Sequence, residues 1–316
     1  MNLLLTGITG NVGHEVALEL DRRSIHITPL VRKGRQDLSV GPLHFNEVVL
    51  ADLLSDDDIQ IMGTIDCIIH CAGAVHFRDA GTKNQEMMNR IVSLAKKLDV
   101  PVYFASTAFV YRPEGSSLIP SNSYEEDKLK AEEILIESGV EYCILRPSVL
   151  VGSTATGALQ NYSGYYQIVK AFLAAAEVAK KQGRTLKFPK AQGFSPILPI
   201  DQAAEYLVSS AVEGRRGIEY ITNSNPPSTD WVLTETLEFF SIQETVVGID
   251  CSFEQFSTRT HTEEEATLFH FIENFSPYWA LDYTFPQSQI IENLINHEYM
   301  VKTLERFSAD NDIVYA

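Results

Sequence analysis

The stretch that decides the fold is NLLLTGITGNVG, residues Asn2–Gly13. Its short apolar run predicts a strand, and the periodic segment NVGHEVALELDRR that follows predicts a helix. Between them, Gly7, Gly10 and Gly13 allow a tight turn, a close approach of the backbone to a pyrophosphate, and close packing of the helix on the strand. The helix N-terminus offers unpaired N–H groups to the phosphates. The sequence therefore predicts a dinucleotide-binding loop.

Strands and helices continue to alternate after this loop. IHITPLVRKG, IDCIIHCAG and VPVYFAST are expected strands, and AGTKNQEMMNRIVSLAKKLD is an expected helix. This alternation predicts right-handed βαβ units and an α/β fold with a doubly wound parallel sheet of the Rossmann type. We expect residues 1–152 to form the dinucleotide-binding domain, with 195–224 returning to it. Residues 153–194 and 225–316 are expected to form a smaller substrate-binding lobe.

Composition and charge narrow the range of partners. The chain has 316 residues, 45% of them hydrophobic, and a formal net charge of −17. This charge argues against nucleic acid or an anionic membrane as a partner, and weakly against an acidic carrier protein. The four cysteines have neither zinc-ligand spacing nor a disulfide framework, so we expect no metal. The N-terminal apolar run is too short for a signal peptide, and we expect a cytoplasmic protein.

The end of the second strand indicates which nucleotide binds. Val31-Arg32-Lys33 stands where a carboxylate would bond an unphosphorylated ribose. An Arg fork matches a 2′-phosphate, so we expect NADP rather than NAD, the alternative being that Arg32 is a solvated charge. Asp52 and Leu53 follow the third expected strand, where they either contact the adenine edge or precede a helix that Asp52 caps, formed by SDDDIQ.

The segment SYEEDKLKAEEIL, Ser123–Leu135, contains Tyr124 and Lys128 one helical turn apart. A phenol has a pKa of about 10, which is too high for proton transfer at neutral pH unless its anion is favoured. A nearby ammonium and the positive ring of an oxidised nicotinamide would favour that anion. Ser106 or Thr107, after a strand, would bond the substrate oxygen. The alternative is that Tyr124 and Lys128 lie on a solvated helix face.

The order TGxxGxxG, DL, HCAG, Asn84, ST, YxxxK and LRPSVLVG resembles the extended short-chain dehydrogenase/reductase family from Asn2 to about Gly152. The segments LVRKG, VGSTATGALQNYSGYYQIVKAF and FSPYWALDYTF are similar to its fatty acyl-CoA reductase and thioester reductase branch. Members of that branch reduce acyl thioesters to aldehydes or alcohols with NADPH. Family members often form homodimers through a contact that would include the helix of Tyr124.

The resemblance implies a role for each matched residue. Tyr124 would be the general acid/base, Lys128 would lower its pKa and hold the ribose, and Thr107 would orient the carbonyl. Asn84 would support the proton relay, or it only caps the helix that follows it. The implied cofactor-binding residues are Gly7, Thr9, Gly10, Asn11, Val12, Gly13, Arg32, Asp52, Leu53, Cys71, Ala72, Gly73, Ser106, Lys128, Pro147 and Ser148.

These features together predict an NADP-dependent oxidoreductase that transfers a hydride to a carbonyl or acyl-thioester carbon. The alternatives are a sugar-nucleotide epimerase or dehydratase, a non-catalytic NADP-sensing protein, and a reductase that depends on a separate carrier protein. The substrate site is expected at the carboxyl ends of the strands. Tyr162, Tyr165, Tyr166 and Phe172 either line an apolar substrate pocket or pack the small lobe.

Overall fold

The structure is a computed structural model, and it divides into two compact units, each described separately below. It describes residues 1–34, 43, 45, 47–55, 58–75, 81–113 and 120–314. Unit 1 comprises Met1–Leu150, Ile200–Thr222 and Phe285–Ile291. Unit 2 comprises Val151–Pro199, Asn223–Thr284 and Glu292–Ala316. The predicted roles of the two regions, dinucleotide binding and substrate binding, stay predictions.

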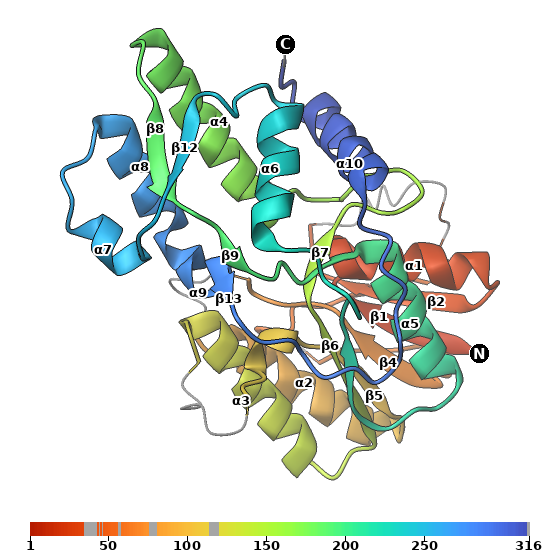
Figure 1. Cartoon of the computed structure of the whole chain (residues 1–316). Coiled ribbons are helices and arrows are strands. Elements are labelled where there is room, and N and C mark those ends of the chain that lie inside the picture. The colour runs from red at the N-terminus through yellow and green to blue at the C-terminus, as the bar shows by residue number, and fades with distance from the viewer. Residues whose placement is uncertain are drawn as a thin grey trace. The chain divides into compact units, whose positions relative to one another are not determined.

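Unit 1 is built on a seven-stranded sheet with the order β11-β6-β5-β4-β1-β2-β3 (Figure 1). Its strands are β1 (Asn2–Thr6), β2 (His26–Val31), β3 (Val49–Leu50), β4 (Cys67–His70), β5 (Val102–Ala105), β6 (Tyr142–Pro147) and β11 (Gly217–Ile221). Neighbouring strands are parallel throughout. The predicted doubly wound parallel sheet is confirmed. Since the order reverses between β1 and β4, the loops that follow these two strands meet at the topological switch point.

Two pairs of helices pack in unit 1. α1 (Asn11–Arg22) packs on α5 (Ile200–Val212), and α2 (Lys83–Leu98) packs on α3 (Ser123–Glu137). Successive side chains of a strand point to opposite faces of the sheet, so each face needs its own cover. The core on the face of α2 and α3 includes Leu4, Ile68, Phe104 and Ile144 from the strands and Met88, Ile91, Ala131 and Leu135 from the helices.

One local expectation was wrong, and one open alternative is decided. VEYCILRPSVLVG was expected as one strand, but it forms β6 and then β7 (Val149–Val151). The interruption falls at Ser148, directly after Pro147, which has no N–H to donate to the sheet. The alternative that Asp52 caps a helix at SDDDIQ is not supported: in the described part of this segment, residues 58–60 have no regular structure. The strand and helix expected in FSPILPIDQAAEYL are present as β10 (Ile197–Pro199) and α5.

Unit 2 contains short strands and helices around an aromatic core. Its helices are α4 (Tyr165–Lys181), α6 (Thr229–Phe239), α7 (Phe253–Ser257), α8 (Glu263–Ile272), α9 (Ser276–Trp279) and α10 (His297–Asp310). Strand β8 (Leu186–Pro189) pairs in parallel with β12 (Val246–Ile249), and β9 (Gln192–Gly193) pairs in parallel with β13 (Ala280–Leu281). At the centre, the Phe188 ring contacts the rings of Phe172, Phe256 and Trp279.

The structure also bears on disulfides, metal ions and membrane spans. The cysteines are free, with Cys67 and Cys143 buried and Cys71 and Cys251 half-buried. Among the described residues, no group of three or more His, Cys, Asp or Glu side chains is placed to hold a metal ion. Within the same part of the chain, no helix is both long and apolar enough to cross a membrane.

Candidate active site

The glycine loop between β1 and α1 is held by close backbone packing. Gly7 has a φ of +74°, and a Cβ on it would lie 2.4 Å from the backbone N of Ala72. A Cβ on Gly13 would lie 2.2 Å from the carbonyl O of Gly7. A Cβ on Gly10 would come no closer than 3.3 Å to that same oxygen, so packing does not demand a glycine at this position. Gly10 is therefore free to serve the close approach of a ligand.

The loop after β4 lies against this glycine loop. The backbone N of Cys71 donates to the carbonyl O of Thr6 at 3.3 Å, and the backbone N of Ala72 donates to Thr6 Oγ1 at 3.2 Å. Thr6 Oγ1 also shares a hydrogen bond of 2.8 Å with His70 Nδ1. Burial, and next the charge of Lys128, lower the pKa of His70 to about 3, which leaves a neutral, hydrogen-bonded core imidazole. Cys71 and Ala72, predicted to touch the cofactor, therefore lie beside the predicted phosphate loop.

The residues predicted to read the adenosine half follow β2 and β3. Arg32 is exposed directly after β2. Asp52 Oδ1 accepts a hydrogen bond from the backbone N of Leu54 at 3.0 Å, so the Asp52 side chain stabilises a turn rather than capping a helix. The Leu53 side chain is buried in the core, which leaves only its backbone for contact with a ligand.

Helix α3 positions the predicted dyad. It begins after Asn122, whose Oδ1 accepts from the backbone N of Glu125 at 3.0 Å. Tyr124 and Lys128 follow one turn apart. The pKa of Tyr124 is raised to about 12, chiefly by burial; the Thr107 side chain opposes this rise by hydrogen bonding, and the carboxylate of Glu125 adds to it. At neutral pH Tyr124 is therefore a protonated phenol.

Lys128 is buried against the end of β5. Its Nζ donates to the carbonyl O of Ala105 at 3.0 Å and lies 4.5 Å from the centre of the Phe104 ring. Burial lowers the pKa of Lys128 to about 8, so the side chain is still mostly protonated at neutral pH. Among the described residues, the groups that act on the pKa of Tyr124 are Thr107 and Glu125. The lowering of this pKa by Lys128 stays a prediction for the enzyme with its cofactor.

The structure favours Thr107 over Ser106 as the hydroxyl partner of Tyr124. Thr107 contacts Tyr124 by a side-chain hydrogen bond. The hydroxyl of Ser106 instead donates to Glu132, and Glu132 Oε2 pairs with Arg146 Nη2 at 2.5 Å. Because Glu132 is buried, Ser106 belongs to a buried charge network behind the site.

Asn84 is buried between two parts of unit 1. Its Nδ2 donates to the carbonyl O of Ala74 at 3.0 Å and to Asp127 Oδ2 at 2.7 Å, and its Oδ1 accepts from the backbone N of Ala74 at 3.0 Å. The N-cap residue of α2 is Thr82, so the interpretation of Asn84 as a helix cap is wrong. The backbone at Gly73 lies next to this amide, because a Cβ there would be 3.2 Å from Asn84 Oδ1.

Pro147 and Ser148 lie at the carboxyl end of β6. The backbone N of Ser148 donates to the carbonyl O of Ile221 at 3.1 Å, but its buried Oγ has no hydrogen-bond partner among the described residues. A buried hydroxyl without a partner costs about 1–3 kcal/mol, so a ligand group that bonds it is favoured. This hydroxyl and the glycine loop between β1 and α1 are features that suit the binding of a dinucleotide.

Sequence reasoning missed the buried carboxylates of α3. Glu125, Asp127 and Glu132 are each at most 1% exposed, although their segment has the composition of a solvated helix face. Glu125 Oε2 pairs with Arg112 Nη2 at 2.6 Å. The spacing did contain a signal, because Asp127 is three residues after Tyr124 and Glu132 is four after Lys128, both on the buried face.

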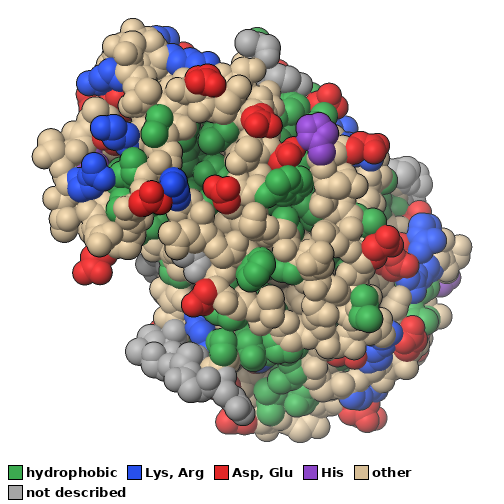
Figure 2. Space-filling view, in the orientation of Figure 1, with side chains coloured by type: hydrophobic (Ala, Val, Ile, Leu, Met, Phe, Trp, Pro, Cys, Tyr) green, Lys and Arg blue, Asp and Glu red, His purple; other side chains and the backbone are tan. Residues whose placement is uncertain are grey.

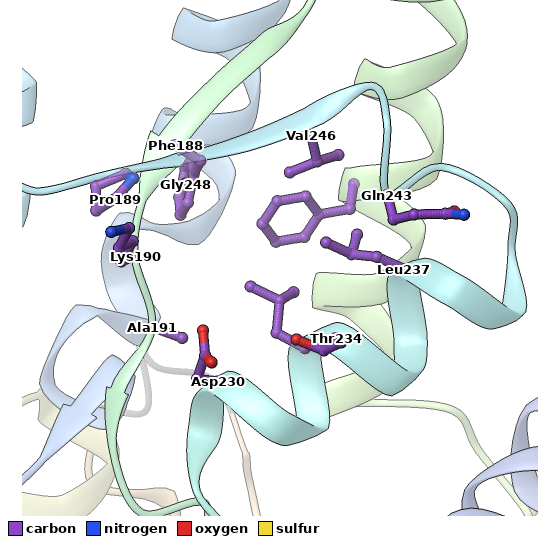
Figure 3. Close-up of a pocket in the computed structure, with 12 residues that line it drawn as sticks. Phe188, Pro189, Lys190, Ala191, Asp230, Thr234, Leu237, Gln243, Val246 and Gly248 are labelled. Atoms are coloured by element: carbon purple, nitrogen blue, oxygen red, sulfur yellow. The ribbon is translucent and has the colours of Figure 1, made fainter.

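Unit 2 contains a pocket of about 270 Å³ between β8, β12 and α6. Figure 3 shows Phe188, Leu237 and Val246 around it, with Asp230 and Lys190 at its margin. In the space-filling view, hydrophobic side chains are visible in the hollow over these elements (Figure 2). The predicted catalytic residues and the predicted cofactor-binding residues do not line this pocket.

The four aromatic residues left open by the sequence have different places. Phe172 lines the pocket of unit 2. Tyr166 is buried and accepts from the backbone N of Gly152 at 3.0 Å, while the Tyr165 hydroxyl bonds Thr236 Oγ1 at 2.6 Å. The Tyr162 ring packs edge-on against Tyr166. Packing therefore accounts for the three tyrosines.

Comparisons with known proteins place the chain among nucleotide-dependent enzymes. A family model described as the NAD dependent epimerase/dehydratase family matches residues 3–185. No curated protein matches the chain. The predicted resemblance to extended short-chain dehydrogenases/reductases is confirmed, and similar structures include reductase domains of the predicted branch.

Three solved structures illustrate the shared fold. The terminal R domain of the myxalamid PKS-NRPS biosynthetic pathway has 18% identity and a TM-score of 0.72, covering 100% of this chain and 92% of that one. A thiolation-reductase di-domain of an archaeal non-ribosomal peptide synthetase has 17% identity and a TM-score of 0.68, covering 99% and 76%. The Thermus thermophilus UDP-glucose 4-epimerase in complex with NAD has 16% identity and a TM-score of 0.60, covering 97% and 99%.

Proposed function

The chain belongs to the NAD dependent epimerase/dehydratase family, and we propose that it is an NADP-dependent oxidoreductase that reduces a carbonyl or acyl-thioester carbon. The observation that supports this most strongly is that the Thr107 side chain is near enough to the Tyr124 phenol to lower its pKa, with the buried ammonium of Lys128 on the same helix. Bound NADPH would supply the hydride. The glycine loop, and the Ser148 hydroxyl without a hydrogen-bond partner among the described residues, support the proposal of this cofactor.

Tyr124 is suited to deliver a proton to an oxygen that gains negative charge. Its pKa of about 12 keeps it protonated at neutral pH, as a proton donor in the reductive direction must be. Thr107 would orient the carbonyl oxygen beside this phenol. The protonated Lys128 would hold the ribose and stabilise the phenolate that remains.

The choice of NADP over NAD depends on Arg32. Its exposed position directly after β2 leaves the guanidinium able to pair with a 2′-phosphate. Arg32→Ala should weaken NADPH binding about 10-fold, since a bond to a charged group contributes about 1.5–3 kcal/mol, and leave NADH binding nearly unchanged. Fluorescence titration with both cofactors measures this, with Arg22→Ala on α1 as the matched control. Equal weakening of both cofactors would mean that Arg32 does not read the 2′-phosphate.

A carbonyl or acyl-thioester substrate is favoured by the residue resemblance to the acyl-reductase branch. The higher TM-scores of the two biosynthetic domains over the epimerase agree with this choice. One of those structures is a thiolation-reductase di-domain, so a carrier-bound thioester belongs among the candidates despite the net charge of −17. The second candidate function is an epimerase or dehydratase, which the family match also supports.

One assay separates these functions. NADPH absorbance and product formation are followed with acyl-CoA thioesters, a carrier-bound thioester, aldehydes and nucleotide sugars, with Tyr124→Phe as the blank. We expect stoichiometric NADPH oxidation with a thioester or an aldehyde. Product without net NADPH loss would replace the reductase by an epimerase or dehydratase. Tight NADPH binding without any turnover would favour a sensing protein.

A further inference from the structure

We propose that Asp127 is a positioning residue of this site, which holds Asn84 and, through it, the loop at Gly73 and Ala74 in the place that cofactor binding requires. The inference deepens the proposed function, because that function assigns this loop to the cofactor. Asp127 lies between Tyr124 and Lys128 on α3, but the hydrogen bonds that the structure describes for it go to another helix.

All the hydrogen bonds of Asp127 that the structure describes go to the first turn of α2. Its Oδ2 accepts from the backbone N and the Nδ2 of Asn84 at 2.9 and 2.7 Å. Its Oδ1 accepts from the backbone N and the Nε2 of Gln85 at 3.3 and 2.8 Å. Thr82, at the N-cap of α2, makes no capping bond with its side chain. Asp127 therefore caps α2 from another helix, and its charge suits the positive end of the helix dipole.

Asn84 links this cap to the loop after β4. Its amide both donates to and accepts from the backbone of Ala74, at 3.0 Å in each direction. A Cβ on Gly73 would lie 3.2 Å from Asn84 Oδ1 and equally 3.2 Å from Lys128 Nζ. The Asn84 amide and the Lys128 ammonium thus both lie against the Gly73 backbone, and a methyl group there would have to displace them by a few tenths of an ångström. Turning the Asn84 amide would move the loop that precedes it.

A carboxylate is the group that this position needs. Four N–H donors converge on its two oxygens, and an amide at residue 127 would turn an NH2 group toward two of them. The charge of Asp127 also supports the protonated form of the buried Lys128. Asp127→Asn conserves volume while removing both effects, which makes it the informative substitution.

The test measures NADPH affinity by fluorescence titration, thermal unfolding and turnover in Asp127→Asn. We expect affinity to weaken about 10-fold, since bonds to a charged group are lost. Glu133→Gln, an exposed carboxylate on the same helix, should bind NADPH as the wild type does. Gln85→Ala removes only the hydrogen bond from the Gln85 side chain to Asp127. It should lower the melting temperature but leave NADPH affinity within about 2-fold, a change of about 0.4 kcal/mol.

A double-mutant cycle identifies the route through Asn84. If Asp127 acts through Asn84, then Asn84→Ala and Asp127→Asn should each weaken NADPH binding, and the double variant should be no weaker than Asn84→Ala. Additive losses would overturn the proposal. An unchanged affinity in Asp127→Asn with a lowered melting temperature would also overturn it, because Asp127 would then be only a helix cap.

Two further outcomes are decisive. If Asp127→Asn does not fold, Asn84→Ser replaces it, because this substitution leaves the hydrogen bonds between Gln85 and Asp127 intact. An unchanged NADPH affinity in Asn84→Ser would then overturn the proposal. The affinity measurements need no substrate. Wild-type protein that binds NADPH but turns over no substrate would therefore contradict the proposed function while the cycle still decides the role of Asp127. Wild-type protein that binds neither dinucleotide would overturn both.

Discussion

The glycine loop and the dyad helix of unit 1 are maintained by different forces. At the loop, Gly7 and Gly13 bring backbone atoms so close that a Cβ would lie 2.2–2.4 Å from another main-chain atom. At the dyad helix, by contrast, carboxylates such as Asp127 and Glu132 are buried against nitrogen donors. The loop is therefore sensitive to the size of a side chain, and the helix is sensitive to charge and hydrogen bonding.

This difference explains which chemistry each region offers. In the proposed function, the loop would bind phosphate through backbone N–H groups, which do not discriminate the rest of the ligand. The helix presents titratable side chains whose pKa values are shifted by burial, as for Tyr124 and Lys128. A change at Tyr124 alone should therefore disturb proton transfer while leaving the glycine loop as it is.

The largest effect is expected from Gly13→Ala. Its Cβ would meet the carbonyl O of Gly7 at 2.2 Å, so helix α1 must move away from β1. We expect a loss of at least about 3 kcal/mol in the free energy of unfolding, the upper range of overpacking, and no detectable dinucleotide binding. Denaturant unfolding and NADPH titration measure the two. Gly10→Ala is the control for stability only, and its loss in the free energy of unfolding should be milder. An equal loss in the free energy of unfolding in both variants would contradict the steric account of the loop.

Glu132→Gln tests whether a buried carboxylate stabilises the dyad helix. The substitution leaves the half-buried guanidinium of Arg146 facing an uncharged amide that can still accept a hydrogen bond, so the loss should stay below about 3–5 kcal/mol, the cost of removing one partner of a fully buried pair. Glu126→Gln breaks an exposed pair with Lys130 on the same helix and should cost less than about 1 kcal/mol. Chemical denaturation compares the two variants. Similar small losses in both would mean that burial does not strengthen the role of Glu132.

Lys128 gives the smallest predicted change in stability, and one with a defined pH dependence. Its pKa of about 8 in the folded protein is below the ordinary 10.5, so the unfolded chain binds more protons between these values. Stability attributable to Lys128 should therefore rise as the pH increases from about 8 to 10.5. Relative to Lys128→Met, the wild type should gain about 1–3 kcal/mol over that interval, with exposed Lys130→Met as the control. A pH-independent difference would contradict the assigned burial of the charge.

The parallel sheet and the glycine loop were predictable because their signals are local. Apolar runs, glycine spacing and helical periodicity near Gly7 and Gly13 are all contained within a dozen residues. The dyad helix was predictable for the same reason. The two alternatives for Asp52 could not be decided from the sequence; in the structure Asp52 bonds the nearby backbone of Leu54 and forms a turn.

The partners of the buried carboxylates could not be predicted. Asp127 meets Asn84 across 43 residues of sequence, and Glu132 meets Arg146 from a different element. Charged residues on a helix ordinarily face water, so composition favours the opposite interpretation of Asp127 and Glu132. Only the fold brings α3 against the first turn of α2 and so reveals that these charges are buried.

Turnover and NADPH affinity of Tyr124→Phe, measured side by side, test the central claim most directly. The substitution removes the phenolic proton and keeps the ring, so turnover with the best substrate of the panel should fall at least about 100-fold. NADPH affinity should stay within about 2-fold of the wild type, because the glycine loop that binds the phosphates is unchanged. Turnover equal to that of the wild type, with affinity unchanged, would contradict the assignment of Tyr124 as the proton donor.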